Sequence, residues 1–339
     1  METPRFITVD DYEPVARELL PPDVYGYYAG GAGDERNLAE NERAFQRWLV
    51  RPRYLRGAGS PDTSTELLGT SLSFPVLVAP WAYHGMAHAD GEAATARAAA
   101  AAGTVMVVSG TVFDGIESLR EACGGPLWWQ LYVYRDRART ADLLARAAAA
   151  GFGAVMWTID WPADPLRHRD TRSGFVLPVG LDADMPFDLD LTWDDLAWVR
   201  EQAPGLPVLV KGVLTSDDAL LAVEAGVDGI VVSNHGGRQL DRAPAALDAL
   251  PEVAEAVDGR VPVLMDGGVR TGTDALTALA LGARAVMVGR PTIWGLAVAG
   301  EAGVADVLRI LHEGFANAMA FTGCRTVDEI DRSLVQPAP

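Results

Sequence analysis

The chain has 339 residues, of which 49% are hydrophobic and 22% charged, so it is long enough to bury a large core. Its net charge of −18 argues against a nucleic-acid surface and against docking on anionic lipid, because both need clustered Lys and Arg. Two unpaired cysteines predict no disulfide framework or metal site, and the lack of a signal peptide or long apolar span predicts a cytoplasmic protein.

The N-terminal region is expected to form a helical extension, residues 1–73. Residues 9–20 predict a helix that ends at Pro21-Pro22, since proline cannot donate a hydrogen bond within a helix. A second helix is expected over 35–45. The glycine-rich segment 27–33, which carries two tyrosines, is expected to connect the two helices.

From residue 74 onward, strand-length apolar runs alternate with alanine-rich helical segments. Runs of this kind suit parallel strands that are buried on both faces. Eight such units favour an α/β fold with one (β/α)8 TIM barrel over 74–325, in a single domain covering 1–339. A doubly wound sheet is the alternative, but the number of repeats favours the barrel. The runs are 75–80, 104–109, 127–131, 154–160, 207–211, 229–233, 261–266 and 285–289.

The longest connection, 161–191, follows the fourth predicted strand and carries four prolines, Pro178 among them, and the basic triplet Arg167-His168-Arg169. Long loops inside compact domains are usually functional. In a barrel, such a loop lies over the active-site face, where the strands end. We therefore expect it to form a short lid, followed by a helix that begins near residues 193–195.

Two late segments predict an anion site. Asp266-Gly267-Gly268-Val269-Arg270 and Gly289-Arg290 follow the last two predicted strands. Glycines let backbone N–H groups approach an anion, and arginine adds a bidentate contact. Tight turns are the plainer interpretation, but the loops after strands seven and eight are the usual phosphate site of barrels. The pattern leaves open whether the phosphate belongs to a cofactor or to a substrate.

The segment 233–241, after the sixth strand, places His235 three residues before Arg238. A carboxylate held by the arginine would fix a neighbouring carbon against the imidazole, which favours a base beside an anion clamp. A lone histidine is more often structural. That role is expected for the histidines without this setting, namely His84, His88, His168 and His312.

The chain resembles the FMN-dependent α-hydroxy-acid oxidising enzymes, which include glycolate oxidase, lactate oxidase, L-lactate dehydrogenase and mandelate-oxidising members. The resemblance extends from about residue 9 to the C-terminal helix. It implies a barrel that binds FMN and oxidises an (S)-2-hydroxy acid to the 2-oxo acid. The segments that carry it are 27–32, 130–132, 210–212, 233–241 and 266–270.

The resemblance implies a role for each residue around the reacting carbon. His235 would be the base, and Asp160 would orient it and stabilise the imidazolium. Tyr132 would hydrogen-bond the substrate near the reacting carbon. A base needs a nearby carboxylate to accept a proton in a buried site. The sequence leaves open whether the base removes the hydroxyl proton or the Cα proton.

The same resemblance implies the binding residues. Arg238 and Tyr27 would bind the substrate carboxylate, with Arg167 as a second cationic contact. Lys211 would lie against the flavin, where its charge stabilises the anionic reduced ring. The other implied cofactor contacts are Pro80, Trp81, Ala82, Ser109, Gln130, Thr158, Ser233, Asp266, Gly267, Gly268, Arg270, Gly289 and Arg290.

Several residues depart from the common family pattern. Trp81 replaces a small or polar residue, and it either faces the pocket or packs into the barrel rim. Thr111 stands where glycolate oxidase-like members have tryptophan, which opens space over the substrate. Asp164, near the start of the lid, either selects a polar or cationic side chain or is an exposed residue without a role. With the short lid, Thr111 favours a substrate larger than lactate, such as an aryl 2-hydroxy acid.

The electron acceptor is expected to be O2, which gives H2O2, because Ala82 keeps the small residue of the family. A dehydrogenase that uses a quinone or a protein acceptor is the alternative within the same chemistry. A flavin-binding barrel isomerase and a non-enzymatic flavoprotein are alternatives from other classes. Relatives are often tetramers, so a homotetramer is expected from the resemblance.

Overall fold

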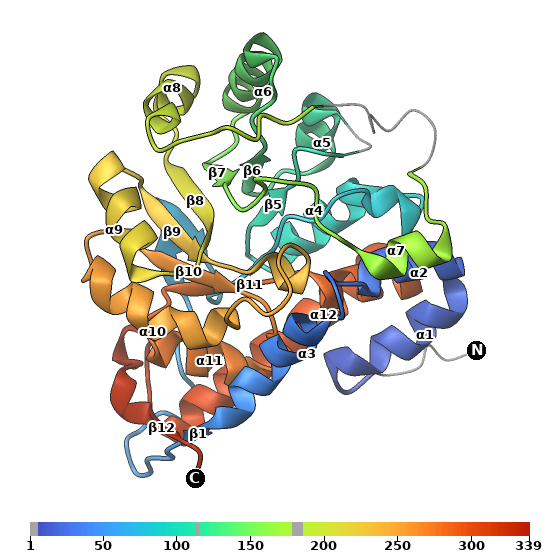
Figure 1. Cartoon of the computed structure of the whole chain (residues 1–339). Coiled ribbons are helices and arrows are strands. Elements are labelled where there is room, and N and C mark those ends of the chain that lie inside the picture. Colours follow the sequence, from blue (N-terminus) through green and yellow to red (C-terminus); the bar gives the residue numbers. More distant parts are fainter. Residues whose placement is uncertain (1–5, 113–114, 178–185) are drawn as a thin grey trace.

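The computed structural model describes residues 6–112, 115–177 and 186–339. Eight parallel strands close into a barrel, with neighbours in chain order from β4 to β11 (Figure 1). This confirms the predicted TIM barrel, and each strand coincides with a predicted apolar run. The strands are β4 (Val76–Val78), β5 (Met106–Val108), β6 (Leu127–Leu131), β7 (Val155–Thr158), β8 (Val208–Val213), β9 (Gly229–Val232), β10 (Val263–Asp266) and β11 (Ala285–Val288).

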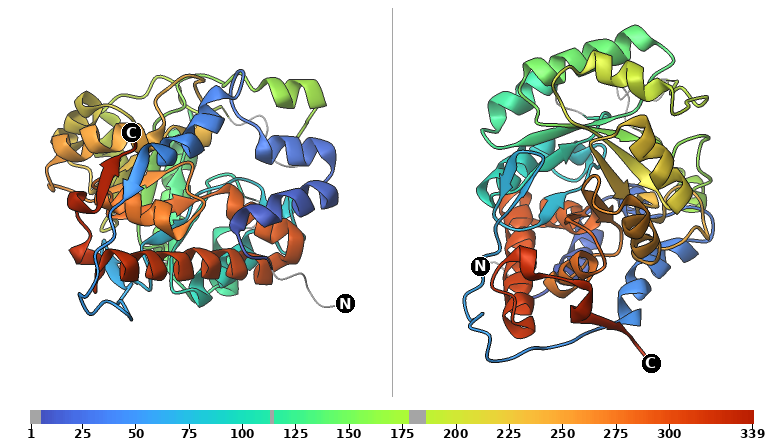
Figure 2. Two further views of the ribbon diagram at one scale, coloured as in Figure 1. Left: turned by 90° about the horizontal axis from the view of Figure 1, so that it is seen from below. Right: turned by 90° about the vertical axis from the view of Figure 1, so that its left-hand side faces the viewer.

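Helices surround the barrel (Figures 1 and 2). Apolar side chains form one cluster inside the barrel and another between the strands and the helices. Successive strand residues point to opposite faces, so Trp128 packs inside the barrel while Trp129 packs outward beneath the helices. Within the described residues, no helix is long and apolar enough to cross a membrane. The surrounding helices are α4 (Gly91–Ala101), α5 (Ile116–Ala122), α6 (Arg137–Ala149), α8 (Asp195–Gln202), α9 (Ser216–Ala225), α10 (Ala246–Val257), α11 (Gly272–Ala280) and α12 (Arg290–Thr322).

The N-terminal extension is not purely helical, which corrects the prediction for 1–73. Strand β1 (Trp48–Val50) pairs antiparallel with β12 (Val335–Pro337). Strands β2 (Thr65–Leu67) and β3 (Thr70–Leu72) form a hairpin whose Leu67 and Leu72 join the inner core of the barrel. The hairpin closes the end of the barrel opposite the active-site face, since Ser73 N–H then bonds Gly103 C=O, just before β5. Three-residue strands are too short to show a periodic pattern.

The predicted first helix is a 3-10 turn, η1 (Val9–Asp11), followed by α1 (Tyr12–Leu19). The predicted connection over 27–33 was partly wrong, because Tyr27, Tyr28 and Ala29 form the last turn of a further helix, α2 (Pro22–Ala29). Pro22 occupies the first helical position, where its missing N–H costs nothing. The predicted second helix is α3 (Arg36–Arg43), continued by η2 (Ala44–Arg47).

The long connection after β7 contains a short helix, α7 (His168–Ser173), that packs against α2 (Figure 1). The sequence did not predict this helix. Pro178, part of the predicted lid, lies outside the described residues. The helix expected near 193–195 is α8, which begins at Asp195. Short 3-10 turns complete the structure: η3 (His84–Met86), η4 (His235–Gly237), η5 (Val327–Glu329) and η6 (Arg332–Leu334).

Candidate active site

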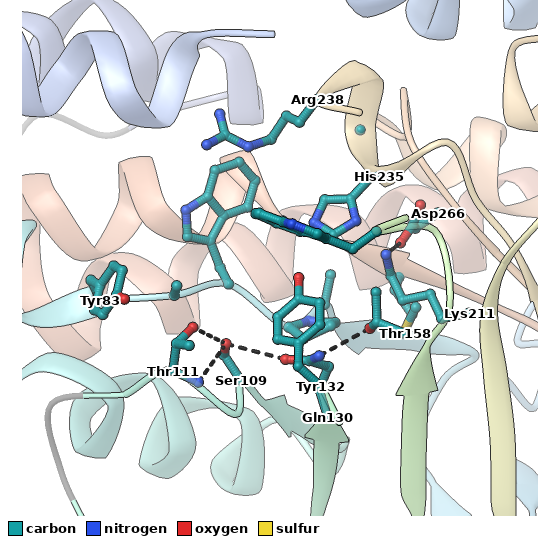
Figure 3. Close-up of a pocket in the computed structure, with 18 of the residues that line it drawn as sticks. Tyr83, Ser109, Thr111, Gln130, Tyr132, Thr158, Lys211, His235, Arg238 and Asp266 are labelled. Carbon is teal, nitrogen blue, oxygen red and sulfur yellow. Dashed lines mark hydrogen bonds and ion pairs between the residues drawn. The ribbon is translucent and has the colours of Figure 1, made fainter. Parts of the chain in front are cut away.

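A cavity of about 560 Å³ opens at the carboxyl ends of the barrel strands. A volume of this size accommodates a cofactor or a drug-sized ligand. Of the residues predicted for the site, Asp160 and Ser233 are missing from the lining, and they contact lining residues from behind. The others line the cavity: Tyr27, Pro80, Trp81, Ala82, Ser109, Gln130, Tyr132, Thr158, Arg167, Lys211, His235, Arg238, Asp266, Gly267, Gly268, Arg270, Gly289 and Arg290. Figure 3 labels eight of them: Ser109, Gln130, Tyr132, Thr158, Lys211, His235, Arg238 and Asp266.

His235 lines the cavity and forms a close pair with Asp160, which lies behind it. Nδ1 of His235 lies 3.0 Å from one carboxylate oxygen of Asp160 and 3.3 Å from the other. An ionised carboxylate accepts hydrogen bonds and cannot donate, so Nδ1 carries the hydrogen and Nε2 is the proton acceptor. Gly212 makes the approach possible, because a Cβ there would lie 2.6 Å from the Cβ of Asp160.

Burial favours a neutral His235 at neutral pH. Burial lowers the pKa of His235, although Asp160 partly opposes this shift. Burial alone would raise the pKa of Asp160, but the charges of His235 and Lys211 and the hydrogen bond from His235 lower it overall. The imidazole is therefore ready to accept a proton beside a carboxylate that stabilises the resulting cation.

Three buried asparagines fix the loop that carries His235. The side-chain amide of Asn234 donates to Oδ1 of Asn37 at 2.8 Å and of Asn41 at 2.7 Å, both on α3. Its Oδ1 accepts from the Gly237 N–H at 3.1 Å. This anchoring holds His235 at φ 58°, a left-handed conformation that non-glycine residues seldom adopt. This network was not predicted from the sequence, although the sequence shows two asparagines in the segment that forms α3.

Arg238, Arg167 and Tyr27 form a cationic corner beside the base. Nη1 of Arg238 donates to the backbone carbonyls of Tyr27 (2.7 Å) and Gly30 (2.8 Å), and its guanidinium lies 5.0 Å from the Tyr27 ring centre. Nε of Arg167 donates to the Arg238 carbonyl at 3.3 Å. Burial raises the pKa of the Tyr27 hydroxyl, which keeps it protonated as a donor. Two cations and a phenol suit a carboxylate ligand.

Polar side chains cover the floor of the cavity between β5 and β7 (Figure 3). The Gln130 side chain accepts from Ser109 Oγ at 3.3 Å and from Gly110 N–H at 2.9 Å, and it donates to Thr158 Oγ1 at 3.0 Å. These contacts fix the amide orientation of Gln130. An ordered row of donors and acceptors of this kind suits the polar edge of a planar ring.

Lys211 adds a buried positive charge to the same floor. Its ammonium donates to Ser233 Oγ at 3.1 Å and lies 3.3 Å from the Asp266 carboxylate. Ser233 in turn donates to Asp266 at 2.6 Å. The lysine side chain is 4% exposed, so its charge acts in a medium of low polarity. A ring that gains negative charge on reduction would be stabilised here.

The predicted phosphate end is held by packing against the N-terminal extension. Gly268 has φ 82°, and a Cβ there would lie 2.1 Å from the Asn41 carbonyl oxygen. Arg270 pairs with Glu42 and lies 3.4 Å from Asp10. The Arg290 guanidinium donates to the carbonyls of Tyr28, Gly236 and Gly30. The first turn of α12 and these two arginines supply positive potential at this end of the cavity.

Aromatic rings form the wall next to His235. The ring centres of Tyr132 and Phe187 lie 4.6 Å apart, and Trp161 meets both rings edge-on at 5.4 and 5.8 Å. Trp161 also lies 6.2 Å from the His235 ring. Burial and the nearby Asp160 raise the pKa of Tyr132, so its hydroxyl stays protonated. Phe187 was not predicted from the sequence, because nothing in the pattern of the lid marks which apolar residue faces the cavity.

The positions that depart from the family pattern also lie at the cavity. Thr111 lines it and bonds Ser109 at 3.0 Å. Asp164 is exposed at the mouth and accepts a hydrogen bond from the Trp161 indole at 3.4 Å. The indole of Trp81 faces the cavity rather than the barrel rim, and it contacts the Arg238 and Arg290 guanidiniums.

The histidines expected to be structural lie outside this lining, in the part of the chain that the structure describes. His84 is buried, its Nδ1 lies 2.9 Å from Thr95 Oγ1, and burial lowers its pKa to about 3. His312 stacks on Phe74 with ring centres 4.4 Å apart. The packing of these two agrees with the structural role.

The barrel and the site together define a class of protein. A base paired with a carboxylate, a carboxylate-binding corner and a buried lysine beside a polar floor suit an oxidoreductase with a bound redox cofactor. The lining fits FMN: the floor offers hydrogen bonds to a ring, Lys211 offers charge to its reduced form, and the loops of Gly268 and Gly289 offer positive potential to a phosphate.

Comparisons with known proteins agree with this class. The model of the family described as FMN-dependent dehydrogenase matches residues 16–337. The 2-hydroxyacid oxidase 1 of Mus musculus is 46% identical over 363 residues, covering 99% of this chain and 98% of that protein. The glycolate oxidase of Spinacia oleracea is 46% identical over 350 residues, covering 96% and 95% of the two chains.

Among solved structures, a mandelate oxidase with benzoyl-formic acid superposes with a TM-score of 0.93 at 41% identity, covering 98% of this chain and 99% of that one. A mandelate oxidase variant with (S)-mandelic acid gives a TM-score of 0.94 at 40% identity, covering 99% and 100%. The chain therefore belongs to the FMN-dependent dehydrogenase family, and it is an FMN-dependent oxidoreductase that acts on CH–OH donors.

Proposed function

We propose that the protein oxidises an (S)-2-hydroxy acid with an aryl side chain to the 2-oxo acid and passes the electrons to O2, which gives H2O2. The observation that carries this proposal is the placement of the His235–Asp160 pair beside both a cationic corner and an aromatic wall. The similarity to a 2-hydroxyacid oxidase and to a mandelate oxidase supports it.

The residues divide the work between binding and proton transfer. Arg238 and Tyr27 bind the substrate carboxylate, and Arg167 adds a second positive charge. The hydroxyl-bearing carbon then lies between the corner and Nε2 of His235, which accepts a proton. Asp160 stabilises the imidazolium that forms. FMN, when bound, supplies the acceptor for the two electrons that the substrate loses.

The aryl preference rests on the aromatic wall, in which the Trp161 ring centre lies 5.4 Å from the Arg167 guanidinium of the corner. Tyr132, Trp161 and Phe187 offer ring faces and edges at spacings typical of aromatic pairs. Thr111 leaves room beside them, since it lines the cavity with a short side chain. A methyl group, as in lactate, would leave much of this apolar surface unfilled.

Anaerobic mixing of the purified protein with a panel of 2-hydroxy acids tests the proposal through the visible band of oxidised flavin. We expect (S)-mandelate to bleach the band faster than lactate or glycolate, and readmitted air to restore it with H2O2. Slow recovery in air would instead identify a dehydrogenase with another acceptor. No bleaching by any hydroxy acid would contradict the proposal, and faster bleaching by glycolate would contradict the aryl preference.

A cytoplasmic location and a homotetramer remain proposals from the sequence. Light scattering coupled to gel filtration tests the second, with an expected mass about four times the 36.1 kDa of one chain.

A further inference from the structure

Arg238 and Arg290 are two buried cations that share a hydrogen-bond acceptor. Both are more than nine-tenths buried, and the backbone carbonyl of Gly30 accepts a hydrogen bond from each, at 2.8 Å in both cases. Arg238 also donates to the Tyr27 carbonyl, and Arg290 also donates to the carbonyls of Tyr28 and Gly236. Within the described residues, no carboxylate lies within ion-pair distance of either guanidinium.

This arrangement costs free energy, because like charges that share one acceptor repel each other in a buried site. Burial and the charge of Arg238 lower the pKa of Arg290 to about 9. Burial and the charge of Arg167 lower the pKa of Arg238 to about 10. The carbonyls at the C-terminal end of α2 compensate part of this cost. The face of an aromatic ring carries negative potential, so a ring placed beside both guanidiniums would offset more of it.

Trp81 is placed to supply this negative potential. The centre of its indole ring lies 5.3 Å from the guanidinium carbon of Arg238 and 5.3 Å from that of Arg290. Both distances fall within the range in which the face of an indole attracts a cation. Gly289 makes room for the ring, since a Cβ there would lie 2.9 Å from an indole carbon. Tyr28 holds the ring from another side, with ring centres 6.1 Å apart.

We propose that Trp81 is a positioning residue that holds both cationic ends of the cavity at once, the carboxylate corner through Arg238 and the phosphate end through Arg290. The proposal rests on the proposed function in assigning the substrate carboxylate to Arg238, and on the predicted phosphate contact in assigning FMN to Arg290. It predicts that one substitution weakens two binding events that involve different ligands. It also predicts that the aromatic face of residue 81 matters more than its volume.

The test compares Trp81→Phe, which keeps an aromatic face, with Trp81→Leu, which keeps an apolar side chain without one. FMN dissociation is measured from the fluorescence of released flavin. Oxalate binding to the FMN-loaded protein is measured from its effect on the visible flavin spectrum, so neither readout needs turnover. A cation–π contact accounts for roughly 2- to 30-fold in a binding constant. We expect Trp81→Leu to raise both dissociation constants at least fivefold, with Trp81→Phe between wild type and Trp81→Leu.

Trp48→Leu is the matched control. Trp48 lies on β1, and its ring centre is 4.6 Å from the Arg332 guanidinium. The Trp48→Leu variant therefore loses a cation–π contact of the same kind at a place away from the cavity. Both constants should stay within twofold of wild type in this variant. If Trp81→Leu does not fold, Trp81→Tyr and Trp81→Met provide the same contrast.

Equal effects of the phenylalanine and leucine variants would overturn the proposal, because packing alone would then explain the residue. A change in one dissociation constant without the other would also overturn it. If no hydroxy acid reduces the flavin but FMN and oxalate binding both follow the aromatic face, the positioning role holds and the proposed function fails. The two proposals are therefore tested separately.

Discussion

Replacing Asp160 with asparagine is the most informative change at this site, because it removes one charge and keeps the side-chain shape. Asp160 lies 3.0 Å from Nδ1 of His235, and the two side chains are only 14% and 18% exposed. Two unit charges about 4 Å apart interact by about 4 kcal/mol at an effective dielectric constant of 20. An asparagine dipole retains part of this stabilisation, so we expect a loss of about 2–4 kcal/mol when the imidazolium forms. This corresponds to a fall of roughly 30- to 1,000-fold in the rate of flavin reduction.

The pH dependence of the Asp160→Asn variant provides a second, independent test of the role of Asp160. The charge of Asp160 raises the pKa of His235, against the larger lowering by burial. Removing that charge therefore lowers the pKa of His235 further. Because the neutral imidazole is the active form, the acid limb of the kcat/KM profile should move to lower pH in Asp160→Asn.

Anaerobic stopped-flow mixing with (S)-mandelate from pH 5 to pH 9 measures both quantities. Asp217→Asn, on the exposed face of α9, is the control for loss of an aspartate. FMN affinity should be unchanged, since Asp160 lies outside the cavity lining. A reduction rate within fivefold of wild type, or an acid limb that moves to higher pH, would refute the assigned role.

Four further changes test other parts of the site. His235→Gln should keep FMN bound and slow flavin reduction by at least 1,000-fold in the same stopped-flow assay, and retained reduction would place the base elsewhere. Arg238→Met should raise the KM for mandelate at least 30-fold in steady-state assays, and an unchanged KM would contradict the carboxylate corner. Phe187→Ala should lower the mandelate-to-lactate ratio of kcat/KM by roughly fivefold, and a constant ratio would refute the aromatic wall. Gly268→Ala should lower Tm by about 5 °C or more in thermal unfolding, because the new Cβ would overlap the Asn41 carbonyl, and an unchanged Tm would show that the loop relaxes freely.

The barrel could be predicted because its strands are buried on both faces and therefore read as continuous apolar runs. The residues at the strand ends could then be predicted to lie together, because the barrel topology brings every carboxyl end to one face. The helix that begins at Pro22 could not, because a proline pair reads equally well as the end of the preceding helix. The Asn37–Asn41–Asn234 network also escaped prediction, because it joins residues almost 200 positions apart in sequence. The direction of the Trp81 indole also escaped prediction, because it depends on Gly289 and Arg290, which are distant from it in sequence.

The pairing of β1 with β12 bears on how the chain is assembled during synthesis. Trp48 lies opposite Pro337, so a strand made early acquires its partner after the whole barrel has been translated (Figure 2). Contacts so distant in sequence form slowly, and the waiting edge of β1 presents unpaired backbone groups to other chains. Arg51 N–H also bonds the Leu334 carbonyl, which extends the same late contact. Removing residues 335–337 should therefore leave the chemistry of the cavity in place but lower the yield of folded protein and increase aggregation at 37 °C.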